Sequence, residues 1–431
     1  MKKVVILSYF FPPCTLTASY RIKSWADYFH ENGIYPIVIT RNWDTPILKL
    51  EDSVKSSGTE LKIEKFDTYE VHYLPYTSSL RDTIYEHYNE TPLKYLSKFL
   101  TAAEILASAF TNFLIPHKNL YHYTLQFIKQ NKDVKCIIAS GKPYDLFRFG
   151  YLIKKKTKMP WVADYRDPWN TLPEEVMKDH LPLRLYNKIK FVEKLWVGSA
   201  TFFITVSTEI KNDIQNFTGI KGYEILNGFD ENDYKNVVHK PTHPKKLLIV
   251  HNGSLPLASK SEVFINGLIP LIEKYKNDIE IVCEYIGVDF TPPAADKIKN
   301  LSKGYEQNFI CTNRIPKKDL LNKLALADCF LMIGHDFKGY PTSKIFEYVA
   351  LKKPVILSPS DNSSMEEILG NTKQLILGHT VEQTTIELEK IIQKKLHQQA
   401  IEVDIDLEAV DSYSRKNQTR KFADLIHQYF A

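Results

Sequence analysis

Residues 339–356 read GYPTSKIFEYVALKKPVI, and this stretch predicts a loop, a helix, a tight turn and a buried strand in succession. Thr342 and Ser343 are residue types that commonly cap the start of a helix, because their hydroxyl oxygens accept hydrogen bonds from its first backbone N–H groups. Four apolar residues then fall on one helical face: Ile345, Phe346, Val349 and Ala350. Pro354 ends the helix, and the apolar run after it starts a strand. The stretch is therefore typical of a helix and the following strand in an α/β domain.

The start of this predicted helix has the features of an anion-binding site. Gly339 precedes it, and the backbone N–H groups at a helix start point outward together. Lys344 adds a positive charge, and the Glu347 carboxylate, one turn further on, can accept hydrogen bonds from a pair of sugar hydroxyls. A phosphate at one end and a diol at the other describe a nucleotide. The alternative is an ordinary capped helix in which Glu347 is exposed to solvent.

Composition indicates a globular protein of two domains. The chain has 431 residues, more than a single hydrophobic core normally covers, with 44% hydrophobic and 25% charged residues. Its formal net charge is +5, which is small for a nucleic-acid-binding protein and favours anionic ligands or an anionic membrane surface. We therefore expect no nucleic-acid partner.

The five cysteines are scattered, without a C-x-x-C pair, and indicate reduced thiols in a cytoplasmic protein without structural zinc. The N-terminal run MKKVVILSYFFPP has two lysines and an apolar core, as a signal peptide has. However, Pro12 and Pro13 interrupt it, and no small-residue cleavage site follows. A buried first strand is the better interpretation. Because no apolar stretch of ~18 residues without charge occurs, no membrane span is expected.

Predicted strands and helices alternate in two successive runs. The first run begins with the apolar strand Val4–Ser8, a polar linker with two prolines follows at residues 231–246, and the alternation restarts at Leu247. Two such runs predict two α/β domains with doubly wound parallel sheets, residues 1–235 and 236–410. Ligands bind these sheets at the carboxyl ends of the strands, so we expect a cleft between the two domains.

Residues 93–115 predict one long amphipathic helix. Its apolar residues keep a helical spacing, and lysines flank it. Packing against the core is the favoured interpretation, because a large apolar stripe usually faces inward. The alternative is a face that rests on a membrane or on a lipid-linked acceptor.

The loop Asp164-Tyr165-Arg166-Asp167-Pro168-Trp169 is the most unusual local sequence, and it follows a predicted strand. Asp164 or Asp167 can orient or deprotonate a hydroxyl group. Arg166 can bind an anion, and Trp169 can stack on a sugar face. Alternatively, Arg166 and Asp167 form an ion pair that fixes the loop. Two carboxylates around an arginine do not make a divalent-metal site.

Gly253-Ser254 follows the first strand of the second run, where a glycine lets the backbone approach a phosphate and Lys260 can neutralise its charge. The alternative is a plain turn. The chain contains no G-x-G-x-x-G, no P-loop motif, no H-E-x-x-H and no G-x-S-x-G, so hydride transfer, P-loop ATP hydrolysis, zincin and hydrolase-elbow interpretations lose support. His251 and His335 lie at strand ends.

Taken together, these segments resemble the retaining glycosyltransferases of the GT-B fold, and especially glycosyltransferase family 4 of bacterial surface-polysaccharide synthesis. The resemblance covers nearly the whole chain. It is carried by these segments in order: Tyr9-Phe10-Phe11-Pro12-Pro13 with Arg21, Ser140-Gly141-x-Pro143, Ala163-Asp164-x-Arg166-Asp167-Pro168-Trp169, Asn227-Gly228-Phe229-Asp230, Pro341-x-Ser343-Lys344-x-x-Glu347-Tyr348 and Lys353-Pro354-Val355-Ile356.

The resemblance implies a nucleotide-sugar donor as co-substrate, no further cofactor, no metal requirement, and a final helix, residues 411–431, that crosses back to the first domain. The donor-binding residues it suggests are Gly253, Ser254, Lys260, Arg314, His335, Thr342, Ser343, Lys344 and Glu347, with Glu347 at the ribose hydroxyls. The acceptor-binding candidates are Pro13, Thr17, Ser19, Arg21, Ser140, Gly141 and Trp169. The catalytic candidates are Asp164, Arg166 and Asp167, with Asp164 at the reacting hydroxyl.

The sequence departs from the family pattern in three features. Gly339 stands where the first member of an acidic pair is usual, the glycine pair of the first loop is replaced near Thr17–Ser19, and a usual arginine–lysine pair is reduced to Lys260 or supplied by Arg314. The resulting hypothesis is transfer of a sugar from a nucleotide-sugar to a glycan or lipid-linked acceptor in cell-surface polysaccharide synthesis, in the cytoplasm or peripherally on the inner face of the membrane. The alternatives are a catalytically silent nucleotide-sugar-binding subunit and a sugar-nucleotide epimerase of related fold.

Overall fold

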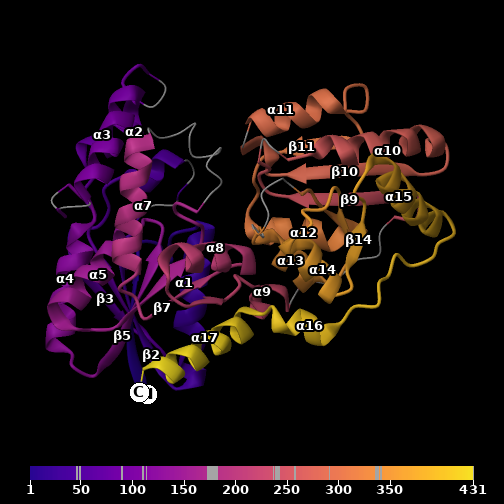
Figure 1. Cartoon of the computed structure of the whole chain (residues 1–431). Helices are drawn as coiled ribbons and strands as arrows, with labels where there is room; N and C mark the ends of the chain where they lie inside the picture. The colour runs from indigo at the N-terminus through magenta and orange to yellow at the C-terminus, as the bar shows by residue number, and fades with distance from the viewer. Residues whose placement is uncertain are drawn as a thin grey trace. The chain divides into compact units, whose positions relative to one another are not determined.

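The computed structural model describes all residues except 45–46, 48–49, 89–90, 109–110, 113, 172–182, 236, 238–242, 257–258, 291, 335–338, 340–341 and 431. The chain divides into two compact units. The first unit comprises Met1–Leu226 and Lys416–Ala431, and the second unit comprises Asn227–Arg415. Figure 1 shows each unit as a layered arrangement of helices and a sheet. We describe each unit by itself.

The first unit is built on an eight-stranded sheet of order β3-β4-β2-β1-β5-β6-β7-β8. All pairs are parallel except β3–β4. The strands are β1 (Lys2–Ser8), β2 (Ile34–Arg41), β3 (Lys62–Lys65), β4 (Glu70–Leu74), β5 (Val134–Gly141), β6 (Trp161–Tyr165), β7 (Phe202–Thr205) and β8 (Gly222–Glu224). The central strands are almost wholly apolar because helices cover both of their faces, which is usual for parallel sheets.

The helices of the first unit are α1 (Thr17–Tyr28), α2 (Leu80–Tyr88), α3 (Lys94–Ser108), α4 (Lys118–Gln130), α5 (Asp145–Thr157), α7 (Leu183–Val197), α8 (Thr208–Thr218) and α17 (Arg415–Tyr429). Three short 3-10 turns occur in the described chain: η1 (His30–Asn32) and η2 (Leu50–Val54) here, and η3 (Val288–Phe290) in the second unit. The edge strand β3 is mostly exposed and polar, so it lacks the apolar pattern that predicts the buried strands.

Both ends of the chain lie in the first unit, as Figure 1 shows. The Lys2 ammonium donates a hydrogen bond to the Phe430 carbonyl oxygen at 2.6 Å. On α17, Phe422 packs against Trp25 of α1, with ring centroids 5.0 Å apart, and Ile426 is fully buried. The helix α17 is therefore part of the core of the first unit.

The second unit contains a fully parallel six-stranded sheet of order β11-β10-β9-β12-β13-β14. Its strands are β9 (Lys246–Asn252), β10 (Glu280–Ile286), β11 (Phe309–Thr312), β12 (Cys329–Met332), β13 (Val355–Leu357) and β14 (Leu375–Leu377). Its helices are α9 (Glu231–Tyr234), α10 (Ser261–Tyr275), α11 (Pro292–Leu301), α12 (Lys317–Leu326), α13 (Lys344–Leu351), α14 (Ser364–Asn371), α15 (Val381–Leu396) and α16 (Leu407–Ser412). The prediction of two α/β domains with parallel sheets is thus confirmed.

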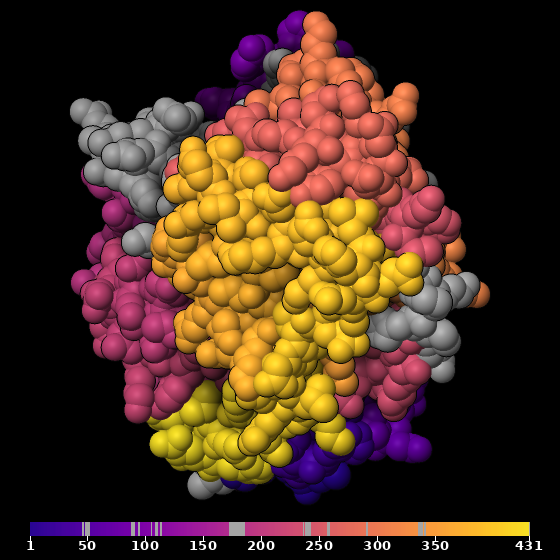
Figure 2. All heavy atoms as spheres, turned by 90° about the vertical axis from the view of Figure 1, so that its right-hand side faces the viewer, coloured from indigo at the N-terminus to yellow at the C-terminus, as the bar shows by residue number. Residues whose placement is uncertain are grey.

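The last helices of the second unit lie on its surface, drawn in yellow tones in Figure 2. The helix α15 packs on α10, where Glu389 accepts hydrogen bonds from Lys274 at 2.5 Å and from the Tyr275 hydroxyl at 2.7 Å. The predicted final helix, residues 411–431, corresponds to α17, which begins at Arg415, and the separate short helix α16 ends before it at Ser412.

The core-packing prediction for residues 93–115 is wrong for the described part of this segment. The helix α3 ends at Ser108, and its apolar residues Tyr95, Leu96 and Phe99 are exposed. Helical spacing identifies an apolar face but does not say which face the neighbouring elements cover. Among the helices of the described chain, none is long and apolar enough to cross a membrane.

Candidate functional site

The second unit has a cavity of about 400 Å³ at the carboxyl ends of β9 and β12. Its described lining residues are His251, Ser254, Leu255, Pro256, Met332, Ile333, Thr342, Lys344 and Met365. In parallel α/β sheets this edge is where ligands bind. Three of the residues proposed for donor binding from the sequence, Ser254, Thr342 and Lys344, are therefore brought together here.

The Lys344 side chain lies directly against the backbone of Gly253 and Ser254. Its Nζ donates a hydrogen bond to the Ser254 carbonyl oxygen at 2.7 Å. Gly253 has φ +96°, and a Cβ at this position would lie 2.1 Å from the Lys344 Cε. Glycine is thus required here both for its backbone conformation and for the close approach of the lysine. Burial lowers the pKa of Lys344 to about 8; the Arg314 charge adds to this effect, and the Glu347 carboxylate opposes it.

Glu347 lies on the first turn of α13, close to the end of β9. The Asn252 side-chain amide donates to the Glu347 Oε2 at 2.7 Å. Burial raises the pKa of Glu347, while the charges of Lys317, Lys344 and Arg415 and the bond from Asn252 act in the opposite direction. One carboxylate therefore lies among several cations, so the surroundings carry an excess of positive charge that suits a phosphate group.

Tyr348, the residue after Glu347, also connects α13 to the end of β9. The Asn252 backbone N–H donates to the Tyr348 hydroxyl oxygen at 2.7 Å, and the buried Tyr348 ring stacks on Phe330 with centroids 4.4 Å apart. Asn252 is thus held through its backbone by Tyr348 while its side chain holds Glu347. This arrangement fixes the carboxylate before any ligand arrives.

The predicted side-chain cap of α13 is not formed in the described structure. Ser343 has helical torsion angles, φ −58° and ψ −19°, and makes no side-chain cap bond. A capping serine needs an extended conformation to reach the helix start, and Ser343 does not have one. Instead, the N–H groups of Ile345 and Phe346 donate to the carbonyls of Thr342 and Ser343 at 3.2 and 3.3 Å. The Lys344 ammonium is therefore the positively charged group at this helix start, and it is bonded to the Ser254 carbonyl oxygen.

The remaining donor candidates lie in different places. Arg314 is exposed and lies beside Gly287. A Cβ added to Gly287 would be 3.3 Å from the Arg314 Cγ. Lys260 is exposed at the start of α10 and is not among the described residues that line the cavity. His335 lies outside the described residues.

His251 is a further cavity residue that the sequence singled out only as a strand-end histidine. Its Nδ1 lies 3.0 Å from the Leu331 carbonyl oxygen, so this nitrogen carries the proton in the neutral ring. Burial, aided by the Lys344 charge, lowers the pKa of His251 to about 3. The imidazole is therefore neutral at physiological pH.

In the first unit, three candidate residues meet inside the protein. Ser140 and Asp164 are register partners on β5 and β6, and the Ser140 hydroxyl donates to Asp164 Oδ2 at 2.6 Å. Arg21 of α1 pairs with Asp164 Oδ1 through Nη2 at 3.0 Å and also donates to the carbonyl oxygens of Ile225 and Leu226. Because all three side chains are buried, this cluster joins α1, the centre of the sheet and the end of the first chain segment.

The loop after β6 is held by hydrogen bonds from Arg166 to backbone carbonyls, and not by the Arg166–Asp167 ion pair that was the alternative to a functional role. Arg166 donates to the carbonyl oxygens of Gly141 and Lys142, both at 2.7 Å. Asp167 is exposed, and its carboxylate lies 3.5 Å from the Lys142 Nζ. Trp169 is half-buried and stacks on Tyr144 with centroids 4.7 Å apart.

The acceptor-binding candidates of the first loop differ in their exposure to solvent. Pro13 and Thr17 are exposed, whereas Ser19 is fully buried and donates to the carbonyl oxygens of Cys14 and Leu16, both at 2.8 Å. Ser19 thus closes the loop before α1.

Sequence reasoning missed two residues of the donor-side site, Asn252 and Tyr348, as functional candidates. Each directly neighbours a predicted residue: Asn252 precedes Gly253, and Tyr348 follows Glu347. Their contact joins positions 96 residues apart. Only the adjacency of β9 and α13 in the fold reveals it.

Comparison with known proteins shows the fold. No family model and no curated protein matches this sequence. Solved structures match over the whole chain. An α,α-trehalose 6-phosphate synthase from Burkholderia multivorans has 10% identity and a TM-score of 0.66, covering 99% of this chain and 97% of the other. A trehalose-6-phosphate protein from E. coli bound with UDP-2-fluoro glucose has 13% identity and a TM-score of 0.63, covering 99% of both chains. A sucrose-phosphate synthase from Thermosynechococcus elongatus has 11% identity and a TM-score of 0.60, also covering 99% of both.

These similar structures are glycosyltransferases of the GT-B fold. The chain described here has that fold: two parallel-sheet α/β units, with a C-terminal helix that belongs to the first. At identities of 10–13% the likeness establishes the fold alone.

Proposed function

We propose that this chain is a retaining glycosyltransferase that moves a sugar from a nucleotide-sugar donor to a glycan or lipid-linked acceptor in cell-surface polysaccharide synthesis. The observation that carries the proposal is the arrangement of Lys344 against Gly253 and Ser254, with Glu347 fixed by Asn252 one turn away. This places a half-buried cation and a half-buried carboxylate at one end of one short helix, where a nucleotide diphosphate would need them.

The roles of these residues follow from their chemistry. The Lys344 ammonium, with the Arg314 guanidinium near it, binds the diphosphate. The Glu347 carboxylate accepts hydrogen bonds from the two ribose hydroxyls, and Asn252 holds it in place. Gly253 leaves room for the Lys344 side chain to lie against the backbone at the end of β9. Binding of this kind uses no cofactor besides the nucleotide-sugar itself.

In the transfer step, the bond between the anomeric carbon and the terminal phosphate oxygen breaks, and a bond from that carbon to an acceptor hydroxyl oxygen forms. The hydroxyl proton leaves with the departing diphosphate or a nearby base. Negative charge grows on the diphosphate as the bond breaks, and Lys344 stabilises it where it develops. The chemistry therefore needs no metal ion, because cationic side chains neutralise the leaving group.

The first unit supplies the acceptor side in this proposal. Pro13, Thr17, Asp167 and Trp169 keep exposed surface for an acceptor. Asp164, with its buried Arg21 and Ser140 partners, acts as a positioning residue that fixes α1 and the loop after β6. A sugar phosphate is the competing acceptor class, since the similar solved structures include synthases of trehalose phosphate and sucrose phosphate, one of them in complex with glucose-6-phosphate.

The test begins with donor binding, measured as thermal stabilisation of the full chain by UDP-, GDP-, CMP- and dTDP-sugars. A ligand at about 100 times its dissociation constant adds about 2.7 kcal/mol of stability, which is readily measured. We expect a shift with one nucleotide class, and its loss in Lys344→Ala and Glu347→Ala. The matched control is Lys276→Ala, because Lys276 is an exposed lysine in the loop before β10, at the opposite edge of the sheet from the donor-side cavity.

Turnover then separates the functions. Release of the free nucleotide with a glycan, lipid-linked or sugar-phosphate acceptor supports transfer and identifies the acceptor class. Saturable binding without turnover favours the silent binding subunit, and interconversion of the bound nucleotide-sugar favours the epimerase. No stabilisation by any nucleotide-sugar would contradict the donor site.

A further inference from the structure

The helix α3 of the first unit is turned with its apolar face outward. Tyr95 and Phe99 have 66% and 68% of their surface exposed, and Leu96 on the same face has 42%. Leu93, just before the helix, and Leu106, near its end, are also exposed. Residues three and four apart share one face of a helix, so these side chains form a continuous stripe. Exposure of such a stripe to water is unfavourable, and contiguous apolar patches of this kind mark protein or membrane interaction sites.

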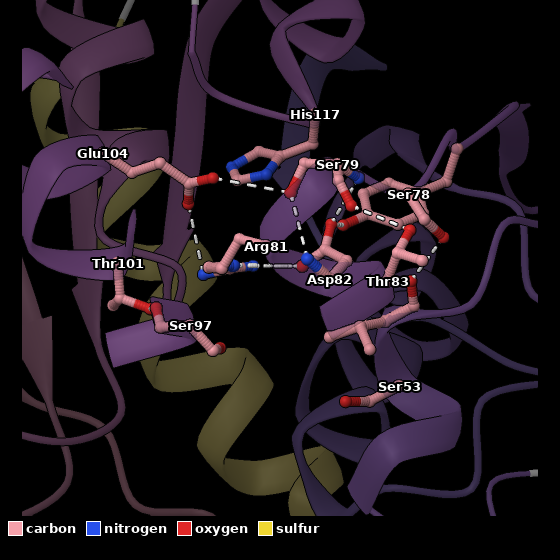
Figure 3. Close-up of polar contacts among 12 residues, drawn as sticks. Ser53, Ser78, Ser79, Arg81, Asp82, Thr83, Ser97, Thr101, Glu104 and His117 are labelled. Atoms are coloured by element: carbon pink, nitrogen blue, oxygen red, sulfur yellow. Dashed lines mark hydrogen bonds and ion pairs between the residues drawn. The ribbon is translucent and has the colours of Figure 1, made fainter. Parts of the chain in front are cut away.

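The opposite face of α3 is polar and faces α2, as Figure 3 shows. On this side, Glu104 Oε2 lies 3.3 Å from an Arg81 nitrogen, and Ser97 and Thr101 line a cavity of about 240 Å³ together with Arg81 and Asp82. Asp82 is fully buried and accepts a hydrogen bond from the Tyr76 hydroxyl at 2.6 Å. These interactions fix the orientation of α3, so its exposed apolar face is a stable feature of the fold.

The neighbouring helix α7 contacts α3 and also carries exposed apolar side chains. Phe191 is 67% exposed and Leu195 is 45% exposed. We call the exposed side chains of Tyr95, Leu96, Phe99, Phe191 and Leu195 the α3–α7 surface. It presents three aromatic rings from two adjacent helices.

Charge identifies the kind of partner. The segments of α3 and α7 contain one acidic residue each, Glu104 and Glu193. Both are turned inward: Glu104 pairs with Arg81, and the fully buried Glu193 accepts hydrogen bonds from Tyr165 and Asn170 at 2.8 and 2.6 Å. Exposed lysines, Lys98 and Lys194, accompany the aromatic residues instead. Among the described side chains of α3 and α7, the exposed ones therefore include aromatic, aliphatic and cationic groups but no carboxylate, and such a surface is complementary to an anionic lipid bilayer.

We propose that the α3–α7 surface docks on an anionic membrane, with Tyr95, Phe99 and Phe191 entering the boundary between headgroups and acyl chains and Lys98 and Lys194 contacting the headgroups. Helices with an apolar face and a basic rim lie in this plane without crossing the bilayer. A second copy of the chain is a less suitable occupant, because two identical surfaces would bring lysines against lysines without an acidic partner.

The proposal is tested by co-sedimentation of the full chain with vesicles of phosphatidylcholine, alone or with about one-third phosphatidylglycerol. No nucleotide-sugar is present, so failure of the proposed glycosyl transfer does not affect the result. We expect binding to the anionic vesicles and a decrease when the salt concentration is raised. Phe99→Ser and Phe191→Ser should each weaken the partition about tenfold.

The matched control is Ile386→Ser, since Ile386 is 54% exposed on α15 of the second unit. It should bind as the unchanged protein does. Lys98→Glu provides a second test that removes no apolar contact, and it should weaken binding to anionic vesicles. The proposal is overturned by absence of binding to anionic vesicles, by equal binding to both vesicle types, or by variants that bind like the control. A dimer in sedimentation velocity that Phe99→Ser dissociates would assign the surface to a second copy instead.

Discussion

The Nη2 atom of Arg21 lies 3.0 Å from Oδ1 of Asp164, and both side chains are buried. The two residues are 143 positions apart in the sequence, and each was a candidate for direct contact with substrate. Each charge compensates the other. This accounts for a buried carboxylate at the end of β6 and a buried guanidinium near the start of α1. A buried ion pair stabilises only while both partners remain, because an unpaired buried charge is costly.

Removal of one partner of this pair should destabilise the first unit. Arg21→Ala is expected to lower the free energy of unfolding by about 3–5 kcal/mol, because Asp164 is left buried without its cation. Ser140→Ala should cost about 1–2 kcal/mol, since one hydrogen bond to Asp164 is lost. Chemical denaturation measures both changes. The control is Arg420→Ala on the exposed side of α17, which should change the stability by less than about 0.5 kcal/mol. Equal stability of Arg21→Ala and the control would contradict the structural role of the pair.

Donor affinity should depend on pH through Lys344. Burial lowers the pKa of this ammonium to about 8, so it is charged below pH 8 and loses its proton above. The dissociation constant of the nucleotide-sugar should therefore be constant below about pH 7.5 and rise above pH 8, by at most about tenfold per pH unit. Titration of binding from acidic to alkaline pH measures this.

The matched variant is Lys344→Arg, whose guanidinium stays charged throughout this range. Its dissociation constant should stay level with pH, whatever its absolute value. If the variant and the unchanged protein show the same pH dependence, another group is responsible for it.

Glu347 should discriminate ribose from deoxyribose. Two hydroxyl groups that donate to a carboxylate contribute about 1.5–3 kcal/mol each, so Glu347→Ala should weaken donor binding by at least about 100-fold. The 2′-deoxy form of the same nucleotide-sugar should bind the unchanged protein less tightly than the ribose form. In the variant this difference should disappear. Calorimetric titration of both ligands against both proteins measures this difference in affinity. A preference for ribose that persists in Glu347→Ala would show that the two ribose hydroxyls do not bind Glu347.

A side chain at Gly253 should disturb the site more than the fold. Gly253→Ala would place a methyl group 2.1 Å from the Lys344 Cε and force the lysine away from Ser254. We expect donor affinity to fall about tenfold or more, with a backbone cost of about 1–2 kcal/mol in stability. Thermal unfolding and nucleotide-sugar titration measure the two effects.

Gly304 offers the control for this variant. It has a similar φ of +89°, but no described heavy atom lies within 4 Å of a Cβ built there. Gly304→Ala should therefore carry the same backbone cost without a loss of affinity. A similar loss of affinity in both variants would show that the effect of Gly253→Ala is general destabilisation.

The fold could be predicted largely from its buried strands. Runs such as Val4–Ser8 are apolar throughout because both faces of a parallel sheet are covered, and this local pattern is visible in the sequence. The antiparallel edge strand β3 and the orientation of α3 could not be predicted. In β3 most side chains are exposed, and in α3 the direction of the apolar face depends on Arg81 and Asp82, which lie on another helix.

The candidate site could be predicted in part. Lys344 and Glu347 follow a loop and begin a short helix, a local arrangement that a sequence reveals. The partner of Asp164 could not be found in this way, because its nearest cation comes from α1. Likewise, the support of Glu347 by Asn252 depends on strand β9 lying beside α13, which is a property of the folded sheet.

The position of α17 has a consequence for the order of folding. The first unit needs Phe422 and Ile426 in its core, yet these residues are synthesised after the whole of the second unit. The first unit can therefore be completed only after the ribosome has synthesised every segment of the second unit. The usual order, in which the N-terminal domain finishes folding first, is reversed in this chain. Until α17 arrives, Trp25 and Phe29 lack the aromatic side chain of Phe422 that packs on them, so the incomplete first unit exposes part of its apolar core.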